Sequence, residues 1–568
     1  MKRNILLLSL ILSLFTSCLD ERNESYTTMD NYFKSVDQIK TGLNGCYNSL
    51  RTIYQARNFW YMTEVSCDLM TLGGKTNYDA ICDVTPARPG CGTIVWKNGY
   101  LGVKNANEMT YAIQQALDNK YIGEADADQL FAEAAILRAL HYYLLTSTFG
   151  DVPFYAERVT EDNRQKIATL PRMDAKATRD YCIDELKEYL VTRRALPMTR
   201  TYTGENYRVG AAVGLMVAAK LCMWNERWDD AIDFITELEK IYAAGKDYAA
   251  YPALFAADYP LTDVPFENRY VKESIFEMAN SVRHQTTSMI ASACIPTKYD
   301  PQSNSGSSAS EDDESTEDTS GTDCYAGIRI PELGTLARTS STVRPTAYLY
   351  KNLLPYDSKD LRSGEYSADS DTRREGSGTL AWRWLGYDAN DADHSGTPTV
   401  RFFWTSKDSN TDLTADKAPW MGNKFWAYGM NDTKEPNNYK IFRFADALLM
   451  KAEAYARKTD PDYFMACAYL SITKVRAGLT EVTFAEDMNS ESEVLIEEIR
   501  KERARELVGE FQRKFDLVRW GIWYTRTTQY NTSSDLNNYI RPCHRYWPIP
   551  ADQVAYSGNA LDNNEYHE

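Results

Sequence analysis

The segment ERARELVGEFQRKFDLVRWG, residues 502–521, decides how the rest of the sequence is interpreted. It combines acids, arginines and aromatic residues, so it could form an acid/base site, a basic face for nucleic acid or part of a helical core. On a helix, one continuous apolar stripe is formed by Leu507, Phe511, Phe515 and Val518. We therefore predict one largely buried helix over this segment.

The charges of the same segment are spaced for pairing on that helix. The pairs at i, i+3 are Glu502 with Arg505, Glu510 with Arg513, and Asp516 with Arg519. Leaving one charge of a buried pair without its partner costs more than the pair contributes. These charges are therefore interpreted as structural, and the segment as scaffold rather than catalytic site.

Further regions repeat apolar residues at a helical spacing of three to four. They are residues 33–47, 96–117, 130–143 (ended by Gly150 and Pro153), 211–242 (two helices that turn at 225–227) and 442–479 (two helices broken at 460–461). The pair in 211–242 is similar to a tetratricopeptide unit, although no strict 34-residue repeat is visible. These patterns predict a mainly all-α fold.

The middle of the chain, residues 280–438, has no helical period. Gly, Ser, Thr, Asp and aromatic residues alternate there, which predicts a loop-rich insertion with a few short strands. Within it, residues 302–323 contain many acids and no large apolar residue, so we expect a mobile, solvated loop. Long irregular segments in a helical protein are uncommon unless they are functional, so we expect the ligand site here.

Charge and motifs exclude several classes of function. The formal net charge is −17, and loss of Lys2 and Arg3 with a signal peptide would make it −19, which repels nucleic acid. The five His include no HExxH spacing, and the eleven Cys include no CxxC pair, so zinc and thioredoxin-type chemistry find no support. No nucleophile elbow or phosphate loop is present either. The chain is not expected to be an enzyme, to need a cofactor or to bind nucleic acid.

The N-terminus, MKRNILLLSLILSLFTSC, has a basic start and an apolar run over residues 5–15. This run is too short to span about 30 Å of hydrocarbon, and it is typical of a secretory signal. Thr16-Ser17-Cys18 resembles a bacterial lipobox, with Phe15 where Leu is more usual. We predict a signal peptide over 1–17, a lipidated Cys18 and a tether over 18–28; the alternative is a plain signal peptide with an incidental cysteine. Export would let disulfides persist, for example Cys82 with Cys91 or Cys294 with Cys324, but the connectivity stays open.

Seven segments, in their order along the chain, together resemble the RagB/SusD family. They are YFKSVDQIKTGLNGCYNSL (32–50), AEAAILRALHYYLLTSTFGDVPFY (132–155), RPTAYLYKNLLPYDSKDLR (344–362), FRFADALLMKAEAYA (442–456), VRAGL (475–479), the opening segment (502–521) and YWPIPADQVAYSGNALDNNEY (546–566). With the lipobox, they span nearly the whole mature chain.

The resemblance implies a scaffold of four tetratricopeptide-like helix pairs, with irregular insertions that build a ligand site. It implies one SusD-like domain over 29–568, made of an N-terminal helical part (29–279), the insertion (280–438) and a C-terminal helical part (439–568). It also implies a glycan-binding lipoprotein, anchored in the outer membrane and facing the cell exterior. The implied partner is a SusC-like, TonB-dependent transporter that receives the glycan. Asp20 and Glu21 are similar to the family's export signal.

Candidate ligand residues follow from position and chemistry. The first group lies in the loop 66–90, where the family commonly contributes polar contacts, and comprises Lys75, Asn77, Tyr78, Asp79 and Arg88. The second group lies in the insertion and comprises Tyr325, Trp382, Trp384 and Tyr387. Trp382 and Trp384 are two residues apart and would share a face of an extended segment, as a platform for a sugar ring.

Three alternatives stay open at this point. The tryptophans could pack on the scaffold, and Lys75 and Arg88 could be solvated charges. The receptor could bind peptides or another nutrient instead of a glycan. The chain could also be a secreted glycoside-active enzyme, since its many Asp and Glu allow a carboxylate pair whose separation sequence cannot show. Whether a structural calcium ion occupies an acidic loop is left open as well.

Overall fold

The structure is a computed structural model that describes residues 32–72, 83–243, 246–266, 268–281, 286–294, 324–326, 342–355, 358–363, 378–381, 383–392, 398–404, 419–422, 424–426, 437–483, 492–531, 533–563 and 566. The predicted signal peptide, Cys18, the tether and the acidic segment 302–323 lie outside these residues. The predicted division of the domain into three parts therefore stays an expectation.

Helices make up most of the described chain. The longer ones are α3 (Val36–Tyr54), α6 (Gly92–Asp118), α7 (Glu124–Phe149), α9 (Ala175–Lys187), α10 (Ala211–Asn225), α11 (Trp228–Tyr242), α14 (Phe444–Arg457), α15 (Tyr463–Arg476) and α16 (Ser492–Glu506). Shorter helices are α4 (Arg57–Trp60), α8 (Arg164–Ala168), α12 (Tyr251–Asp258), α13 (Ile290–Cys294), α17 (Arg513–Arg519), α18 (Trp523–Tyr530), α19 (Ser534–Tyr539) and α20 (Ala551–Tyr556). A π-helical turn covers Tyr61–Val65. The predicted mainly helical fold is confirmed.

The strands form small antiparallel sheets. They are β1 (Met70–Leu72) with β4 (Val343–Pro345), β2 (Ser274–Met278) with β9 (Tyr439–Arg443), β5 (Leu380–Ala381) with β8 (Trp420–Met421), and the three-stranded sheet of β3 (Cys324–Ala326), β6 (Arg383–Ala392) and β7 (Pro398–Trp404) in the order β3–β6–β7. Except for β1, β2 and β9, all of them come from the insertion.

Successive helices pack as pairs, most extensively α6 with α7, α10 with α11 and α14 with α15. Small residues let α6 and α7 approach closely. A Cβ on Gly99 would lie 2.7 Å from Leu145 Cδ2, and a Cβ on Gly102 would collide with the ring of His141. The turn predicted at residues 225–227 is confirmed, with Glu226 in the left-handed region at φ +58° between α10 and α11. The break predicted at 460–461 is confirmed between α14 and α15.

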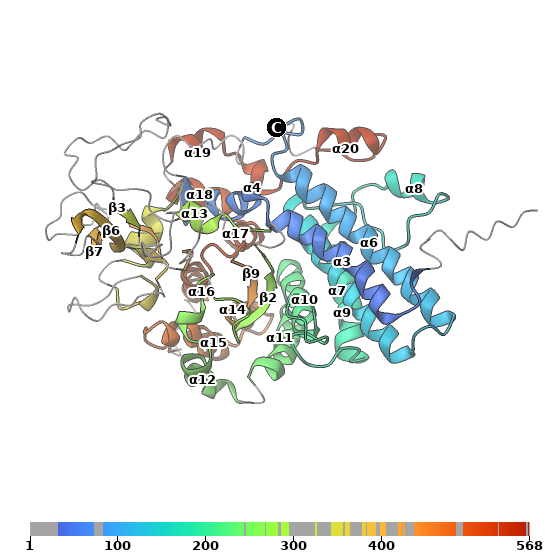
Figure 1. Ribbon diagram of the computed structural model, residues 1–568, viewed down its shortest axis with the longest axis horizontal. Coiled ribbons are helices and arrows are strands. Elements are labelled where there is room, and N and C mark those ends of the chain that lie inside the picture. Colours follow the sequence, from blue (N-terminus) through green and yellow to red (C-terminus); the bar gives the residue numbers. More distant parts are fainter. Residues whose placement is uncertain are drawn as a thin grey trace, which may run out of the picture.

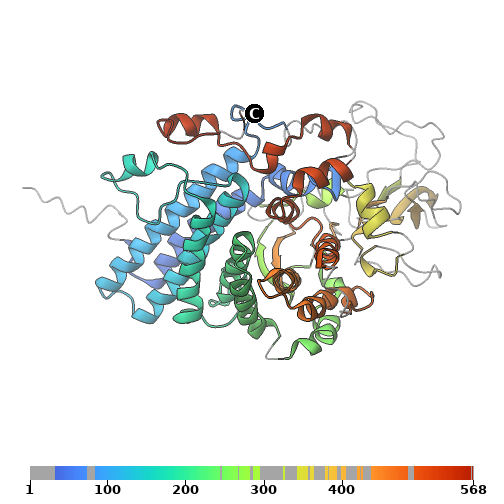
Figure 2. The ribbon, with the colours of Figure 1, turned by 180° about the vertical axis from the view of Figure 1, so that it is seen from behind.

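The N-terminal helices and the three-stranded sheet lie at opposite sides of the molecule. Helices α3, α6, α7 and α9 form one side, α10, α11 and α14–α16 follow, and β3, β6 and β7 lie on the far flank (Figure 1). The view from behind shows the same order, with the short helices α18–α20 along one edge (Figure 2). The three-stranded sheet of the insertion thus lies away from the N-terminal helix pairs.

The prediction of one helix over 502–521 is wrong. Helix α16 ends at Glu506 and α17 begins at Arg513. In the turn between them Gly509 has φ +79° and Phe511 has φ +61°, which no α-helix accommodates. The turn is stabilised by Glu64, whose carboxylate accepts hydrogen bonds from the backbone N–H groups of Gly509 (2.9 Å), Gln512 (2.7 Å) and Arg513 (3.1 Å).

The charge pairs predicted in this segment are partly confirmed. Glu502 with Arg505 (2.9 Å) and Asp516 with Arg519 (3.0 Å) form as predicted. Glu510 and Arg513 do not pair, because the turn separates them. Glu510 instead lies 2.8 Å from Arg443 and 2.6 Å from Lys424, and Arg513 lies 2.5 Å from Asp68. Glu502, Glu510 and Asp516 are buried in the protein core rather than at its rim.

Cys91 is a free, buried thiol, so the disulfide considered between Cys82 and Cys91 does not form. Cys294 is buried at the end of α13, while the side chain of Cys324 lies outside the described part of the chain.

Candidate functional site

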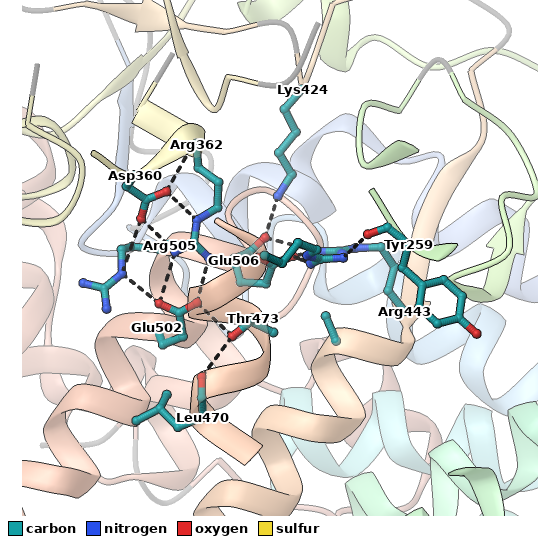
Figure 3. A network of polar contacts seen from close by, with 12 residues as sticks. Tyr259, Asp360, Arg362, Lys424, Arg443, Leu470, Thr473, Glu502, Arg505 and Glu506 are labelled. Atoms are coloured by element: carbon teal, nitrogen blue, oxygen red, sulfur yellow. Dashed lines mark hydrogen bonds and ion pairs between the residues drawn. The ribbon is translucent and has the colours of Figure 1, made fainter. Parts of the chain in front are cut away.

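The acids of residues 502–510 form a buried network with cations from distant segments (Figure 3). Arg362 lies 2.8 Å from Glu502 and 2.9 Å from Glu506, and Glu506 also lies 2.9 Å from Arg443 and 2.5 Å from Arg476. Burial raises the pKa of Glu502, but Arg362 and Arg505 more than offset this and lower it to about 2. These carboxylates are ionised, enclosed and fully engaged by arginines, so they are unsuited to act on a polymer substrate as an acid/base pair.

Of the candidate loop 66–90, the structure describes residues 66–72, which are mostly buried and end in β1, and residues 83–90, which turn between Thr85 and Arg88. Lys75, Asn77, Tyr78 and Asp79 lie outside the described residues, so the ligand roles predicted for them stay predictions. Arg88 pairs with Asp83 at 3.0 Å, its side chain is 66% exposed, and its backbone N–H donates to Thr85 Oγ1 at 3.2 Å. The polar partners of Arg88 among the described residues thus lie within five positions of it in the sequence, and its guanidinium is accessible to solvent.

The two candidate segments begin at neighbouring ladders. In one ladder, Thr71 of β1 is the register partner of Arg344 of β4, and β1 ends at Leu72, directly before residues 73–82. In the other Ala381 is the register partner of Trp420, directly before Trp382. The guanidinium of Arg344 stacks 3.1 Å from the centre of the Trp420 ring and joins the two ladders. The fold therefore brings the starts of both segments together, although they are far apart in the sequence.

The second candidate group lies on a regular sheet rather than in a loop. Residues 383–388 of β6 pair one to one with 404–399 of β7, without a register shift among them. Tyr387 is also the register partner of Tyr325 on β3. Alternate residues of a strand share a face, so Tyr325 and Tyr387 belong to one face and Trp384 to the other. Trp382 lies outside the described residues.

Trp384 and Tyr387 are three positions apart on a regular strand and therefore belong to opposite faces, and the ligand roles predicted for both stay predictions. The two faces also differ in composition. One face carries Arg383, Leu385, Tyr387, Val400, Phe402 and Trp404, and the other carries Trp384, Gly386, Asp388, Thr399, Arg401 and Phe403. Apart from Arg383 at its end, the first face is apolar, whereas the second combines two aromatic residues with polar and charged ones.

Sequence reasoning missed Arg344 and Trp420 as candidate residues near the site. Both are half-buried at the junction of the two ladders. Arg344 stands in a segment that served only as a family signature, and no spacing rule connects it with Trp420. The signal that could have found them is the pairing of β1 with β4 and of β5 with β8, which is a tertiary feature.

The residues that the structure describes contain no group of three or more His, Cys, Asp or Glu arranged to hold a metal ion. None of their helices combines the length and apolarity needed to cross a membrane.

Comparisons with known proteins were made for the whole chain. A family profile described as "SusD family" matches residues 272–567, and one described as "Starch-binding associating with outer membrane" matches residues 18–201. SusD-like protein P25 from Formosa agariphila is 23% identical over 581 residues, which cover 98% of this chain and 97% of that protein.

Solved structures share the fold at low sequence identity. Surface glycan-binding protein A from Bacteroides uniformis superposes with a TM-score of 0.62 at 20% identity, covering 93% of this chain and 99% of that chain. Surface glycan-binding protein A from Bacteroides thetaiotaomicron, in complex with laminarihexaose, superposes with a TM-score of 0.62 at 19% identity, with the same coverage of 93% and 99%.

Proposed function

The chain belongs to the SusD family, and on this premise we propose that it captures an oligo- or polysaccharide at the cell surface and delivers it to a SusC-like, TonB-dependent outer-membrane transporter. The family consists of binding proteins rather than enzymes, in keeping with the engaged state of the buried carboxylates. We place the ligand contacts in the insertion 280–438 and the loop 66–90.

The proposed location is the outer membrane, with a lipid anchor on Cys18 and the folded domain facing the exterior. The match to the family described as associating with the outer membrane begins at residue 18, the cysteine expected to be lipidated. Each buried CH2 of an acyl chain adds about 0.8 kcal/mol, so several chains on one cysteine would anchor the protein firmly. Anchoring also keeps copies near the transporter, which compensates for modest affinity at each site.

The observation that carries the ligand class is the composition of the two faces of the β6–β7 ladder. An apolar face suits packing against protein, whereas an aromatic residue among polar ones suits a sugar, whose C–H face stacks on a ring while its hydroxyls form hydrogen bonds. Trp384 and Phe403 are register partners, with Asp388, Thr399 and Arg401 on the same face. We assign glycan contact to this face, which we call the Trp384 face, and packing to the face of Tyr325 and Tyr387.

Laminarin is the first glycan to test, since a structural relative is known in complex with laminarihexaose. Purified protein is run through gels that contain laminarin, soluble starch, xylan or mannan. Retardation by at least one of them is expected. Trp384→Ala should weaken binding about tenfold, or about 1.4 kcal/mol, without a large change in melting temperature.

Tyr387→Ala is the matched control on the other face of the same strand. It should leave retardation of the folded protein intact, because it changes only the face assigned to packing. Unchanged retardation of Trp384→Ala would overturn the assigned face. Retention by peptide mixtures and by none of the glycans would replace the glycan with a peptide, and release of sugar products would favour an enzyme.

A further inference from the structure

The buried network around α16 includes two cations that the insertion contributes, Arg362 and Lys424. Lys424 Nζ lies 2.6 Å from Glu510 Oε1 and donates to the backbone oxygen of Glu506 at 2.9 Å. Arg362 contacts Glu502 and Glu506, as described above, and Figure 3 shows both cations approaching α16 from the insertion side. The side chain of Lys424 is only 2% exposed and that of Arg362 only 3%. The insertion is therefore fastened to the scaffold inside the core.

The same two residues hold the backbone at the base of the β5–β8 ladder. The N–H of Thr379 donates to Arg362 O at 2.7 Å, and the N–H of Lys424 donates to Gly378 O at 3.1 Å. The N–H of Gly422 donates to Thr379 O at 2.8 Å and closes the ladder between them. Strand β5 ends at Ala381, and β6 with the Trp384 face follows after one residue. The ionic contacts and the β5–β8 ladder are thus parts of one hydrogen-bonded unit, and the chain continues from it into β6.

We propose that Lys424 and Arg362 are positioning residues for ligand binding. Their buried contacts with α16 and with Glu510 in the turn after it set the place and orientation of the β5–β8 ladder, and through it of the Trp384 face. Neither residue needs to touch the ligand. The inference rests on the proposed function, because it concerns the placement of the face assigned to the glycan. If their role were purely structural, breaking these pairs would affect ligand binding no more than breaking another buried ion pair of the core.

Lys220 offers a closely matched comparison within the scaffold. Its Nζ lies 2.5 Å from Asp446 Oδ2 and donates to Gln512 Oε1 at 2.8 Å, and its side chain is 5% exposed. Burial lowers the pKa of both Lys220 and Lys424. Each carboxylate partner also contacts an arginine: Asp446 contacts Arg503 at 2.9 Å, and Glu510 contacts Arg443 at 2.8 Å. Lys220 differs in that its ion-pair partner Asp446 lies in α14 and its hydrogen-bond partner Gln512 lies in the turn between α16 and α17, so neither belongs to the insertion.

The experiment compares Lys424→Met with Lys220→Met in the full chain. Both substitutions should lower the melting temperature, because each leaves a buried carboxylate short of one cation. Binding to laminarin, or to the panel polysaccharide that the wild-type chain retains, is measured well below both melting temperatures. Lys424→Met should weaken it about tenfold, about 1.4 kcal/mol, and Lys220→Met should leave it unchanged.

Amide hydrogen exchange gives a readout that needs no ligand. Lys424→Met should speed exchange along β5, β6 and β8, and Lys220→Met should not. If Lys424→Met does not fold, Lys424→Gln and Lys220→Gln, which keep one polar contact, replace the pair.

Equal affinities and equal exchange in the two variants would overturn the inference while the proposed function stands. A wild-type chain that binds none of the glycans would overturn the proposed function. If hydrogen exchange along β5, β6 and β8 were still faster in Lys424→Met than in Lys220→Met, Lys424 would position the ladder without a role in glycan binding.

Discussion

Arg513 shows at the scale of one residue why partners could not be read from spacing. Sequence spacing pairs it with Glu510, but its Nε and Nη2 lie 2.7 Å and 2.5 Å from the two carboxylate oxygens of Asp68, which is far away along the chain. Both side chains are buried. The interpretation of Arg513 as a structural residue is independent of which acid it pairs with, because either pair lies away from solvent.

Arg513→Ala should therefore destabilise the protein by about 3–5 kcal/mol, because Asp68 would stay buried without its cation. Affinity for glycan per folded molecule should not change. Chemical unfolding followed by tryptophan fluorescence measures the first effect, and gel retardation the second.

Arg193→Ala is the control for Arg513→Ala. Arg193 lies 3.1 Å from Asp128, but both side chains are exposed, at 41% and 37%. Loss of such a surface pair should cost about 0–1 kcal/mol. Equal losses in Arg193→Ala and Arg513→Ala would contradict the structural role of the Arg513–Asp68 pair.

At the scale of elements, the break between α16 and α17 is the main difference between prediction and structure. The apolar period continues through the turn because Leu507, Val508 and Phe511 are buried there as they would be on a helix. Periodicity reports burial, and it cannot separate a buried turn from a buried helix. A glycine inside the pattern was the one local signal, and Phe511 at φ +61° is a conformation that no sequence rule predicts for a bulky residue.

Gly509→Ala tests this turn directly. A Cβ would collide with the Phe425 ring, and the φ of +79° is unfavourable for alanine. Gly521→Ala has a similar φ of +72° but no neighbour within 4 Å of its Cβ. Gly521→Ala should cost about 1–2 kcal/mol from backbone strain, and Gly509→Ala clearly more, as measured by thermal unfolding. If the two cost the same, the contact with Phe425 is not tight.

At the scale of the whole molecule, the buried ionic network makes stability depend on pH. Burial raises the pKa of Glu502 and of Asp516, but the neighbouring arginines outweigh it, so both carboxyls have a lowered pKa, about 2 for Glu502 against an ordinary 4.5. A group whose pKa is lower in the folded state stabilises the protein above its unfolded pKa. That stabilisation is lost as the pH falls through the folded pKa.

The melting temperature should therefore fall steadily as the pH is lowered from about 4.5 towards about 2. Calorimetry across this range measures the effect. Repeating the series at high salt is the control, because buried pairs are screened much less than surface pairs. A pH dependence that disappears in high salt would mean that surface charges, and not this network, are responsible.

The sequence by itself determined the mainly helical fold and the family, because apolar periodicity and ordered local segments do not depend on what lies across the fold. It also placed Trp384 and Tyr387 in the insertion, since residue type and chain position are local properties. Only the tertiary structure decided that these two residues belong to opposite faces, that Arg344 and Trp420 join the two candidate segments, and that Lys424 and Arg362 fasten the insertion to α16. Strand register and buried ion pairs depend on segments that meet only when the chain folds, so no local pattern encodes them.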